Sequence, residues 1–194
     1  ILSFKDTNVK NFAKGTSVFV GFQNYISLIH DSTFQLVFKN TIVFTIACLV
    51  VQFTIGFILA VFFSQKFSIA GPIRGLILVA YMMPMSVTAL LGKNLFGVSE
   101  GVINDLLMKI GIIHEPIEWL VSSSTAMFAV IAVNCWVGIP FNMLLLTSGL
   151  TGISEDVYES ASLDGANRMQ RFFYITLPLM KSSILAVLML GFIY

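Results

Sequence analysis

The sequence predicts an all-α integral membrane protein, a bundle of about four transmembrane helices with a helical loop outside the membrane. Of its 194 residues, 57% are hydrophobic and only 11% are charged, whereas soluble domains are about 45–50% apolar and roughly 25% charged. A net charge of +1 provides no basic surface for a phosphate backbone. The composition therefore excludes a soluble globular domain, a disordered tail and a nucleic-acid-binding protein.

The first predicted span covers residues 40–64, within a window over residues 40–65 that contains no charged side chain. As a helix this window is about 39 Å long, against roughly 30 Å of hydrocarbon. A charge at the bilayer centre costs on the order of 2.5–3.5 kcal/mol, which explains the clean window. Residues 1–39 mix lysines with aromatic residues, a composition typical of a segment at the membrane surface.

A second span is predicted over residues 75–96, after a short turn that contains Gly71 and Pro72. Its charge-free part, residues 75–92, is about 27 Å long as a helix and crosses the bilayer if Lys93 reaches the interface. Residues 98–121 follow, and within them apolar residues recur on one helical face. They predict an amphipathic helix that lies on the bilayer: Val102, Ile103, Leu106, Leu107 and Ile110.

The third charge-free window, residues 119–154, is too long for one straight span and too short for two with a turn. We predict one helix over 124–147 with apolar flanks, broken at Pro140. A fourth span is predicted over 175–194, with Lys181 near its start.

The loop over residues 150–174 predicts two short helices with a break between them. Ser154 is a suitable N-cap for the first, and Asp164-Gly165 forms the break, with Asp164 as the cap of a second helix that carries Arg168. Leu177-Pro178 then marks the return into the membrane. One face of the first helix is mostly small and suits close docking of another surface: Tyr158, Ala161, Ser162 and Gly165.

This loop resembles the EAA loop of permeases from binding-protein-dependent ATP-binding cassette (ABC) importers. That signature reads Glu-Ala-Ala, three residues, Gly, nine residues, Ile-x-Leu-Pro. Six residues match it at the expected spacing: Glu159, Ala161, Gly165, Ile175, Leu177 and Pro178. Ser160 replaces the second residue of the signature and is also small. Segments outside the loop, residues 19–25 and 136–141 among them, are similar to the maltose-type sugar permease branch of this family.

The resemblance implies a permease subunit that forms the membrane pathway for a sugar or oligosaccharide. Its EAA loop would be cytoplasmic and would couple to a separate ATPase through seven residues: Glu159, Ser160, Ala161, Asp164, Gly165, Ala166 and Arg168. Charge counting over short loops favours the same orientation by five cations to two, with Lys66 and Arg74 on the cytoplasmic side. The lysines of the first segment oppose it.

The same resemblance implies the assembly and its location. The expected partners are a second, related permease subunit, two copies of the ATPase, an extracytoplasmic solute-binding protein and membrane lipid. The complex would be multi-pass in a bacterial or archaeal cytoplasmic membrane. About six core spans are expected in the complete subunit, so at least one span would precede Ile1 and another would follow Tyr194.

The chain itself is expected to be a transport subunit and not an enzyme. It has no Gly-x-x-x-x-Gly-Lys-Ser/Thr segment to hold ATP phosphates, so ATP would be used by the partner and no cofactor would be bound here. No metal site is expected, because the two histidines stand apart and Cys48 and Cys135 are most simply small apolar residues.

Each complete span has a stripe of small or polar residues at helical spacing. Six of these residues are candidates for the substrate pathway: Gln52, Tyr81, Thr88, Asn134, Gly138 and Asn142. Small and polar residues also mediate helix packing in bilayers, and the three amides are equally consistent with interhelical hydrogen bonds. Pro84 and Pro140 either impose static kinks or permit bending between transport states.

The uncharged spans favour a neutral solute, since they offer no buried arginine or glutamate to bind an ion. An ion-coupled secondary transporter of a neutral solute is the alternative function. Such proteins usually place acidic or basic relays inside the bilayer, and these spans have none. An intramembrane enzyme is excluded, because the spans contain no nucleophile–base pair.

Overall fold

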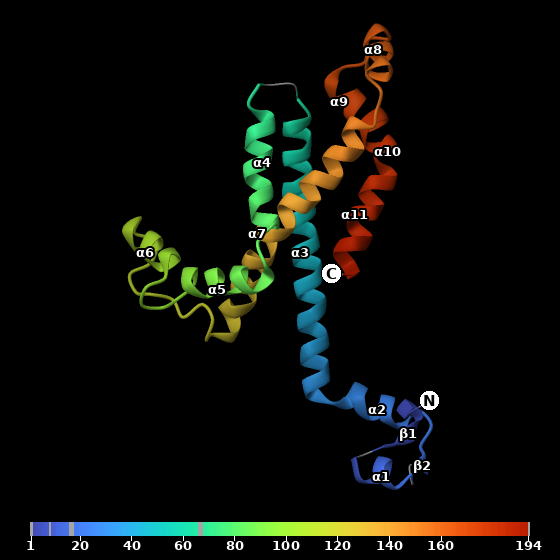
Figure 1. Ribbon diagram of the computed structural model, residues 1–194, viewed down its shortest axis with the longest axis vertical. Helices are drawn as coiled ribbons and strands as arrows, with labels where there is room; N and C mark the ends of the chain where they lie inside the picture. Colours follow the sequence, from blue (N-terminus) through green and yellow to red (C-terminus); the bar gives the residue numbers. More distant parts are fainter. Residues whose placement is uncertain (1, 8, 16–17, 66–67, 194) are drawn as a thin grey trace. The chain divides into compact units, whose positions relative to one another are not determined.

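The computed structural model describes residues 2–7, 9–15, 18–65 and 68–193 (Figure 1). Lys66, Ile1 and Tyr194, named above, lie outside these residues. The chain divides into two compact units, Ile1–Phe44 and Thr45–Tyr194.

The N-terminal unit contains a small hairpin packed against a short helix. The chain begins with a 3-10 turn η1 (Leu2–Phe4) and strand β1 (Lys5–Asp6), which pairs antiparallel with β2 (Val18–Phe19). Helix α1 (Val9–Lys14) lies between the two strands in the sequence, and α2 (Gln23–His30) follows β2. The ring of Phe4 contacts the rings of Phe22 and Tyr25, with centroids 5.3 and 5.5 Å away. Two-residue strands leave no period-2 pattern, so the sequence did not predict this hairpin.

The two longest helices match two of the predicted spans. Helix α3 (Ser32–Ser64), which continues from the first unit into the second, has 33 residues and α7 (Ser123–Thr151) has 29. Both are long and apolar enough to cross a membrane. The predicted break at Pro140 is wrong, because α7 runs through that residue without interruption. Pro140 is buried, and neighbouring helices allow such prolines inside membrane helices.

The other two predicted spans, 75–96 and 175–194, are each a pair of helices with a bend between them and not one continuous helix. Helices α4 (Ala70–Tyr81) and α5 (Met85–Leu95) meet at 91°. The break coincides with Pro84, whose ψ of 139° is extended and whose nitrogen cannot donate to the preceding turn. Counting each bent pair as one span, the described residues provide up to four spans.

The second bent pair starts in the loop over residues 150–174. Helices α8 (Glu155–Leu163) and α9 (Arg168–Arg171) are followed by a π-helical turn η2 (Phe172–Thr176) and by α10 (Leu177–Leu179). A bend of 62° then separates the helix ending at Leu179 from α11 (Lys181–Ile193). A π-turn just before Pro178 accommodates the missing proline donor and its bulky ring.

Helix α7 is the central element of the second unit and contacts α4, α5 and α11 (Figure 1). Its fully buried side chains Met143 and Leu146 lie at the centre of the apolar core. Leu146 packs with Ala60, Met180 and Val187, so the core joins α3, α7 and the last helices.

The segment between α5 and α7 folds around one buried amide. Asn104 on α6 (Val102–Lys109) is only 1% exposed. Its Nδ2 donates to the carbonyls of Gly97 (3.1 Å) and Ile117 (3.0 Å), and its Oδ1 accepts from the Ile117 amide (3.1 Å) and from Trp119 Nε1 (2.8 Å). Sequence reasoning missed Asn104, because its partners are up to 15 residues away.

Replacing Asn104 with alanine is expected to loosen this segment without changing the spans. The substitution leaves several buried backbone groups and the indole N–H unpaired, at about 2 kcal/mol or more. The Ile117 amide should then exchange hydrogen roughly 30-fold faster, since local opening sets that rate. Mass spectrometry of hydrogen exchange measures the change. Asn94→Ala, at an exposed position on α5, is the matched control, and equal effects of the two variants would contradict the assignment.

Candidate functional site

The loop over residues 150–174 is built from two capped helices joined by a tight turn. Ser154 caps α8 as predicted, since its Oγ accepts from the backbone N–H of Asp156 (3.4 Å). At the other end the Ala166 amide donates to Ala161 O (2.9 Å) and the Gly165 amide to Ser162 O (3.1 Å). These two bonds form a Schellman motif. Gly165 is its glycine, with φ at +82°, a conformation that costs other residues about 1 kcal/mol or more.

The cap of the second helix differs from the prediction. Asn167, and not Asp164, caps α9: its Oδ1 accepts from Gln170 N (2.9 Å) and Gln170 Oε1 accepts from Asn167 N (2.8 Å). Asp164 is instead the C-cap of α8. The Schellman motif includes Gly165 and Ala166, so α9 begins further towards the C-terminus, at Arg168.

Two side-chain contacts hold α8 against the following helices. Arg171 Nη1 donates to Ser162 Oγ (2.7 Å), and the hydroxyls of Tyr158 and Thr176 are hydrogen-bonded at 2.9 Å. Tyr158 and Ser162 therefore face inward, towards the rest of the loop. The small face predicted from the sequence is partly occupied by the protein itself.

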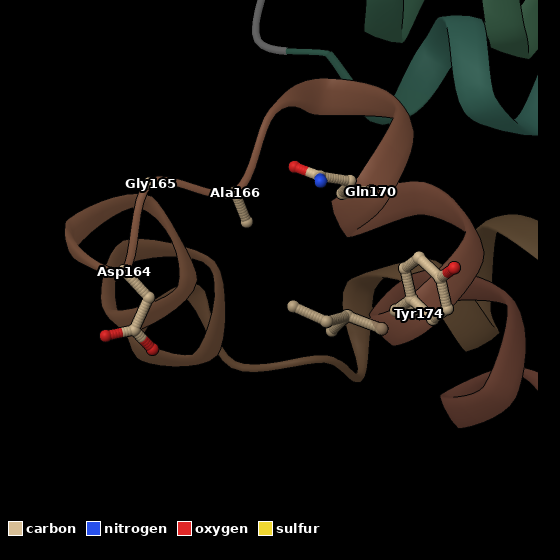
Figure 2. Close-up of a pocket in the computed structure, with 6 residues that line it drawn as sticks. Asp164, Gly165, Ala166, Gln170 and Tyr174 are labelled. Atoms are coloured by element: carbon tan, nitrogen blue, oxygen red, sulfur yellow. The ribbon is translucent and has the colours of Figure 1, made fainter.

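A hollow of about 300 Å³ opens beside the turn. Figure 2 shows Asp164 and Tyr174 on opposite sides of it, with Gly165, Ala166 and Gln170 along the rim between them; Ile175 also lines it. Three of the seven residues predicted for ATPase coupling thus line one hollow: Asp164, Gly165 and Ala166. Glu159, Ser160 and Arg168 are exposed on the same loop outside this hollow, and Ala161 is half-buried.

Large apolar side chains project from the loop and were not among the predicted residues. Leu163, the last residue of α8, is 90% exposed, and Met169 and Tyr174 are also exposed. Exposed apolar residues grouped next to a concave surface are typical of a protein interaction site. The signal in the sequence was weak, because a single leucine in a polar loop has no periodic pattern.

A second group of predicted residues meets where α3 crosses α7. Gln52 Nε2 donates to Asn134 Oδ1 (2.7 Å), and Asn142 Nδ2 donates to Gln52 Oε1 (3.4 Å) and to Gly138 O (2.8 Å). All three amides predicted for the pathway are therefore joined in one interhelical network. Their role as a pathway lining stays a prediction.

Glycines allow the two helices to approach closely at this crossing. A Cβ on Gly138 would run into the Gln52 side chain, and one on Gly56 would lie 2.7 Å from Asn142 Cβ. Small residues at such contacts are a general device of membrane helix packing.

The remaining two predicted pathway residues lie outside the amide network. The ring of Tyr81 stacks on Phe141 with centroids 5.2 Å apart. Thr88 is buried, and its Oγ1 donates to the Pro84 carbonyl (3.3 Å). The structure thus places the aromatic and hydroxyl candidates beside the α4–α5 break and the amides at the α3–α7 crossing.

The amide network predicts a measurable coupling between Gln52 and Asn134. Gln52→Leu or Asn134→Leu alone leaves one amide unpaired in an apolar region, whereas the double variant removes both partners. We expect the double variant to be more stable than the sum of the single losses predicts, by about 0.6–1.7 kcal/mol. Reversible unfolding in detergent–lipid micelles measures the cycle. The same cycle with the exposed Ser148 in place of Asn134 is the control, and additive losses for Gln52 and Asn134 would contradict the network.

Comparison with known proteins identifies the family. Residues 52–194 match the model of the family described as "Binding-protein-dependent transport system inner membrane component". The sulfoquinovosyl glycerol transport system permease SmoG of Agrobacterium fabrum is 34% identical over 170 residues, which are 88% of this chain and 54% of that protein. The trehalose/maltose transport system permease MalF of Thermococcus litoralis is 30% identical over 89% of this chain and 58% of its own length.

The fold has a counterpart among solved structures. The crystal structure of a bacterial alginate ABC transporter, in complex with an alginate-bound periplasmic protein, contains a chain with a TM-score of 0.78 and 24% identity. The match covers 88% of this chain and 59% of that one. The chain spans a little over half the length of the relatives named here. With the family model covering most of its residues, the chain belongs to the family of binding-protein-dependent transport system inner membrane components.

Proposed function

We propose that this chain forms part of the permease subunit of an ABC importer and that a separate ATPase docks on the loop over residues 150–174, the coupling loop. The observation that carries the proposal is the loop itself. Two capped helices and a Schellman turn present exposed Leu163 beside a hollow lined by Asp164, Gly165 and Ala166. A rigid, partly apolar pair of short helices between two spans is suited to transmit movement from a protein partner.

The solute is proposed to be a neutral sugar or oligosaccharide. Relatives carry the names of permeases for trehalose/maltose, galactooligosaccharides and lactose, whereas the solved neighbour is a transporter of the acidic polysaccharide alginate. The charge-free spans of this chain favour the neutral class. Amide and hydroxyl groups bind sugars through hydrogen bonds, and α3, α4, α5 and α7 supply Gln52, Tyr81, Thr88, Asn134 and Asn142. Movement between two states would open the network at the α3–α7 crossing and release these amides for the solute.

The proposed assembly contains a second, related permease subunit, two ATPase copies and an extracytoplasmic solute-binding protein in the cytoplasmic membrane of a bacterium or archaeon. ATP would be bound and hydrolysed on the ATPase only. Alternating access driven by that ATPase is the proposed mechanism.

Reconstitution tests the proposal. The full-length permease is copurified with its ATPase, placed in proteoliposomes, and given a radiolabelled maltodextrin, its binding protein and internal ATP. Uptake should require both ATP and the ATPase and should persist when ionophores collapse all ion gradients. Uptake that needs an ion gradient and proceeds without the ATPase would establish the ion-coupled alternative instead.

Substrate protection tests the pathway residues separately. In a background without Cys48 and Cys135, single cysteines replace Asn134 or Asn142, and the exposed Trp136 serves as the control position. A maltodextrin should slow alkylation of the first two and leave the third unchanged. If maltodextrin changes the alkylation rate at none of the three positions, or by the same factor at all three, the α3–α7 crossing does not line the pathway.

A further inference from the structure

Helix α6 is held in one orientation beside the start of the spanning helix α7. The hydrogen bonds of Asn104 attach it to the segments on both of its sides in the sequence. Trp119, which donates to Asn104, packs its ring against Phe128 of α7 and Phe96, with centroids 6.0 and 5.7 Å apart. The faces of α6 therefore have fixed directions relative to that end of α7.

Three arcs with different chemistry cover the surface of α6 except for Met108, which is exposed alone on the remaining flank. At about 100° per residue, Ile103, Asn104 and Leu107 share the arc that is buried or half-buried against the protein. The charged residues Asp105 and Lys109 lie roughly opposite and are exposed. The prediction that Ile103 and Leu107 face the bilayer with Val102, Leu106 and Ile110 is therefore wrong, because the hydrogen bonds of Asn104 turn the first arc inward.

The third arc lies between the other two and is apolar but uncovered. Val102, Leu106 and Ile110 follow one another at steps of four residues and are 50%, 53% and 65% exposed. It points about 100° away from the inward arc, on average, and about 80° from the charged edge. One side of this helix contacts the protein, the charged side suits water, and the third side suits an apolar environment.

We propose that α6 is an interfacial helix whose Val102–Leu106–Ile110 arc is embedded in the lipid at the boundary of the bilayer. Proteins of this family are components of the inner membrane, so lipid surrounds them. Phe128 and Val130, near the start of α7, are also exposed and apolar. Residues 98–121 hold four acidic side chains and one lysine, so zwitterionic headgroups are the matching lipid. The proposal does not depend on which solute is carried.

Neighbouring residues of α6 provide a matched test, because adjacent positions face different arcs. In the full-length permease complex, single cysteines replace Leu106 or Asp105, and in a second pair Ile110 or Lys109, each labelled with the fluorophore NBD. The complex is placed in phosphatidylcholine vesicles that contain a lipid with a doxyl spin label near its headgroup. All four positions are exposed, so the labels do not displace the core.

We expect the two quenchers, spin-labelled lipid and iodide, to act most strongly on opposite members of each pair. The labels at Leu106 and Ile110 should be quenched about two-fold more strongly by the spin-labelled lipid than those at Asp105 and Lys109, since the interface buries an apolar face by about 5–10 Å. Aqueous iodide should quench the opposite members more strongly.

Three outcomes would overturn the proposal. Equal iodide quenching of all four labels would place the arc in water. Shielding of the labels at Leu106 and Ile110 from lipid and iodide alike would indicate a protein contact within the complex. Protection of these two labels only after the solute-binding protein is added would make the arc a protein docking surface. An Asn104→Ala complex should lose the contrast within each pair, and an unchanged contrast would show that Asn104 does not set the orientation.

Discussion

Gly165→Asp is expected to abolish ATP-driven transport while the permease still folds and inserts. The residue lies at φ +82° at the rim of the coupling-loop hollow and has open space around it. Aspartate tolerates this backbone conformation better than most residues, so the cost in folding is about 1 kcal/mol. Its charge, however, would be desolvated beneath a docked ATPase, at several kcal/mol. Uptake should fall at least about tenfold, because 1.4 kcal/mol is already a factor of ten.

Gly111 provides a matched control for this variant. It ends α6 in the same motif, with φ at +75° and nothing within 4 Å, and the amides of Gly111 and Ile112 donate to Met108 and Leu107. Gly111→Asp therefore makes the same change to charge and backbone at a different site. We expect it to retain most of the uptake measured in proteoliposomes.

Two further variants separate charge from backbone strain. Gly165→Asn keeps the tolerance for positive φ without the charge and should retain more uptake than Gly165→Asp. Glu159→Lys changes charge on an exposed α8 position and should also lower transport and transport-coupled ATP hydrolysis. Wild-type coupling in both Gly165→Asp and Glu159→Lys would refute the docking of an ATPase on this loop.

Features that depend on composition over many residues could be predicted from the sequence. The charge-free windows located α3 and α7, because the cost of burying a charge acts on every residue of a span. The N-cap at Ser154 and the break at Gly165 followed from local rules for helix ends. For the same reason the position of the coupling loop could be predicted without tertiary information.

Features that depend on contacts between distant residues could not be predicted in this way. Averaged hydropathy is the same for a straight span and for a pair bent by 91°, so Pro84 indicated a kink or a hinge but not a bend of this size. Asn104 looked like any polar residue of a surface helix until Trp119 and Ile117 folded around it. The meeting of Gln52 with Asn134 required the relative rotation of α3 and α7, which periodicity alone leaves open.

Gly56→Ala is expected to destabilise the protein although alanine is the better helix former. In an open helix this substitution gains up to about 1 kcal/mol. At Gly56 the new Cβ would lie 2.7 Å from Asn142 Cβ and 3.1 Å from the Met143 backbone nitrogen, and backbone atoms cannot move aside. Overpacking of this kind costs about 1–3 kcal/mol, so the melting temperature should fall by roughly 3–10 °C.

Gly75 supplies the control with the opposite sign, because it lies in α4, is exposed and has nothing within 4 Å. Gly75→Ala should leave the melting temperature unchanged or raise it, as followed by size-exclusion chromatography after heating. A fall equal to that of Gly56→Ala would show that the effect does not come from the close contact at Gly56.

Separation of α3 from α7 at Gly56 would also stretch the hydrogen bond between Gln52 and Asn134. Gly56→Ala combined with Gln52→Leu should then cost less than the two changes added together, since the first change has already weakened what the second removes. Additive losses would mean that the glycine contact and the amide network hold the crossing independently.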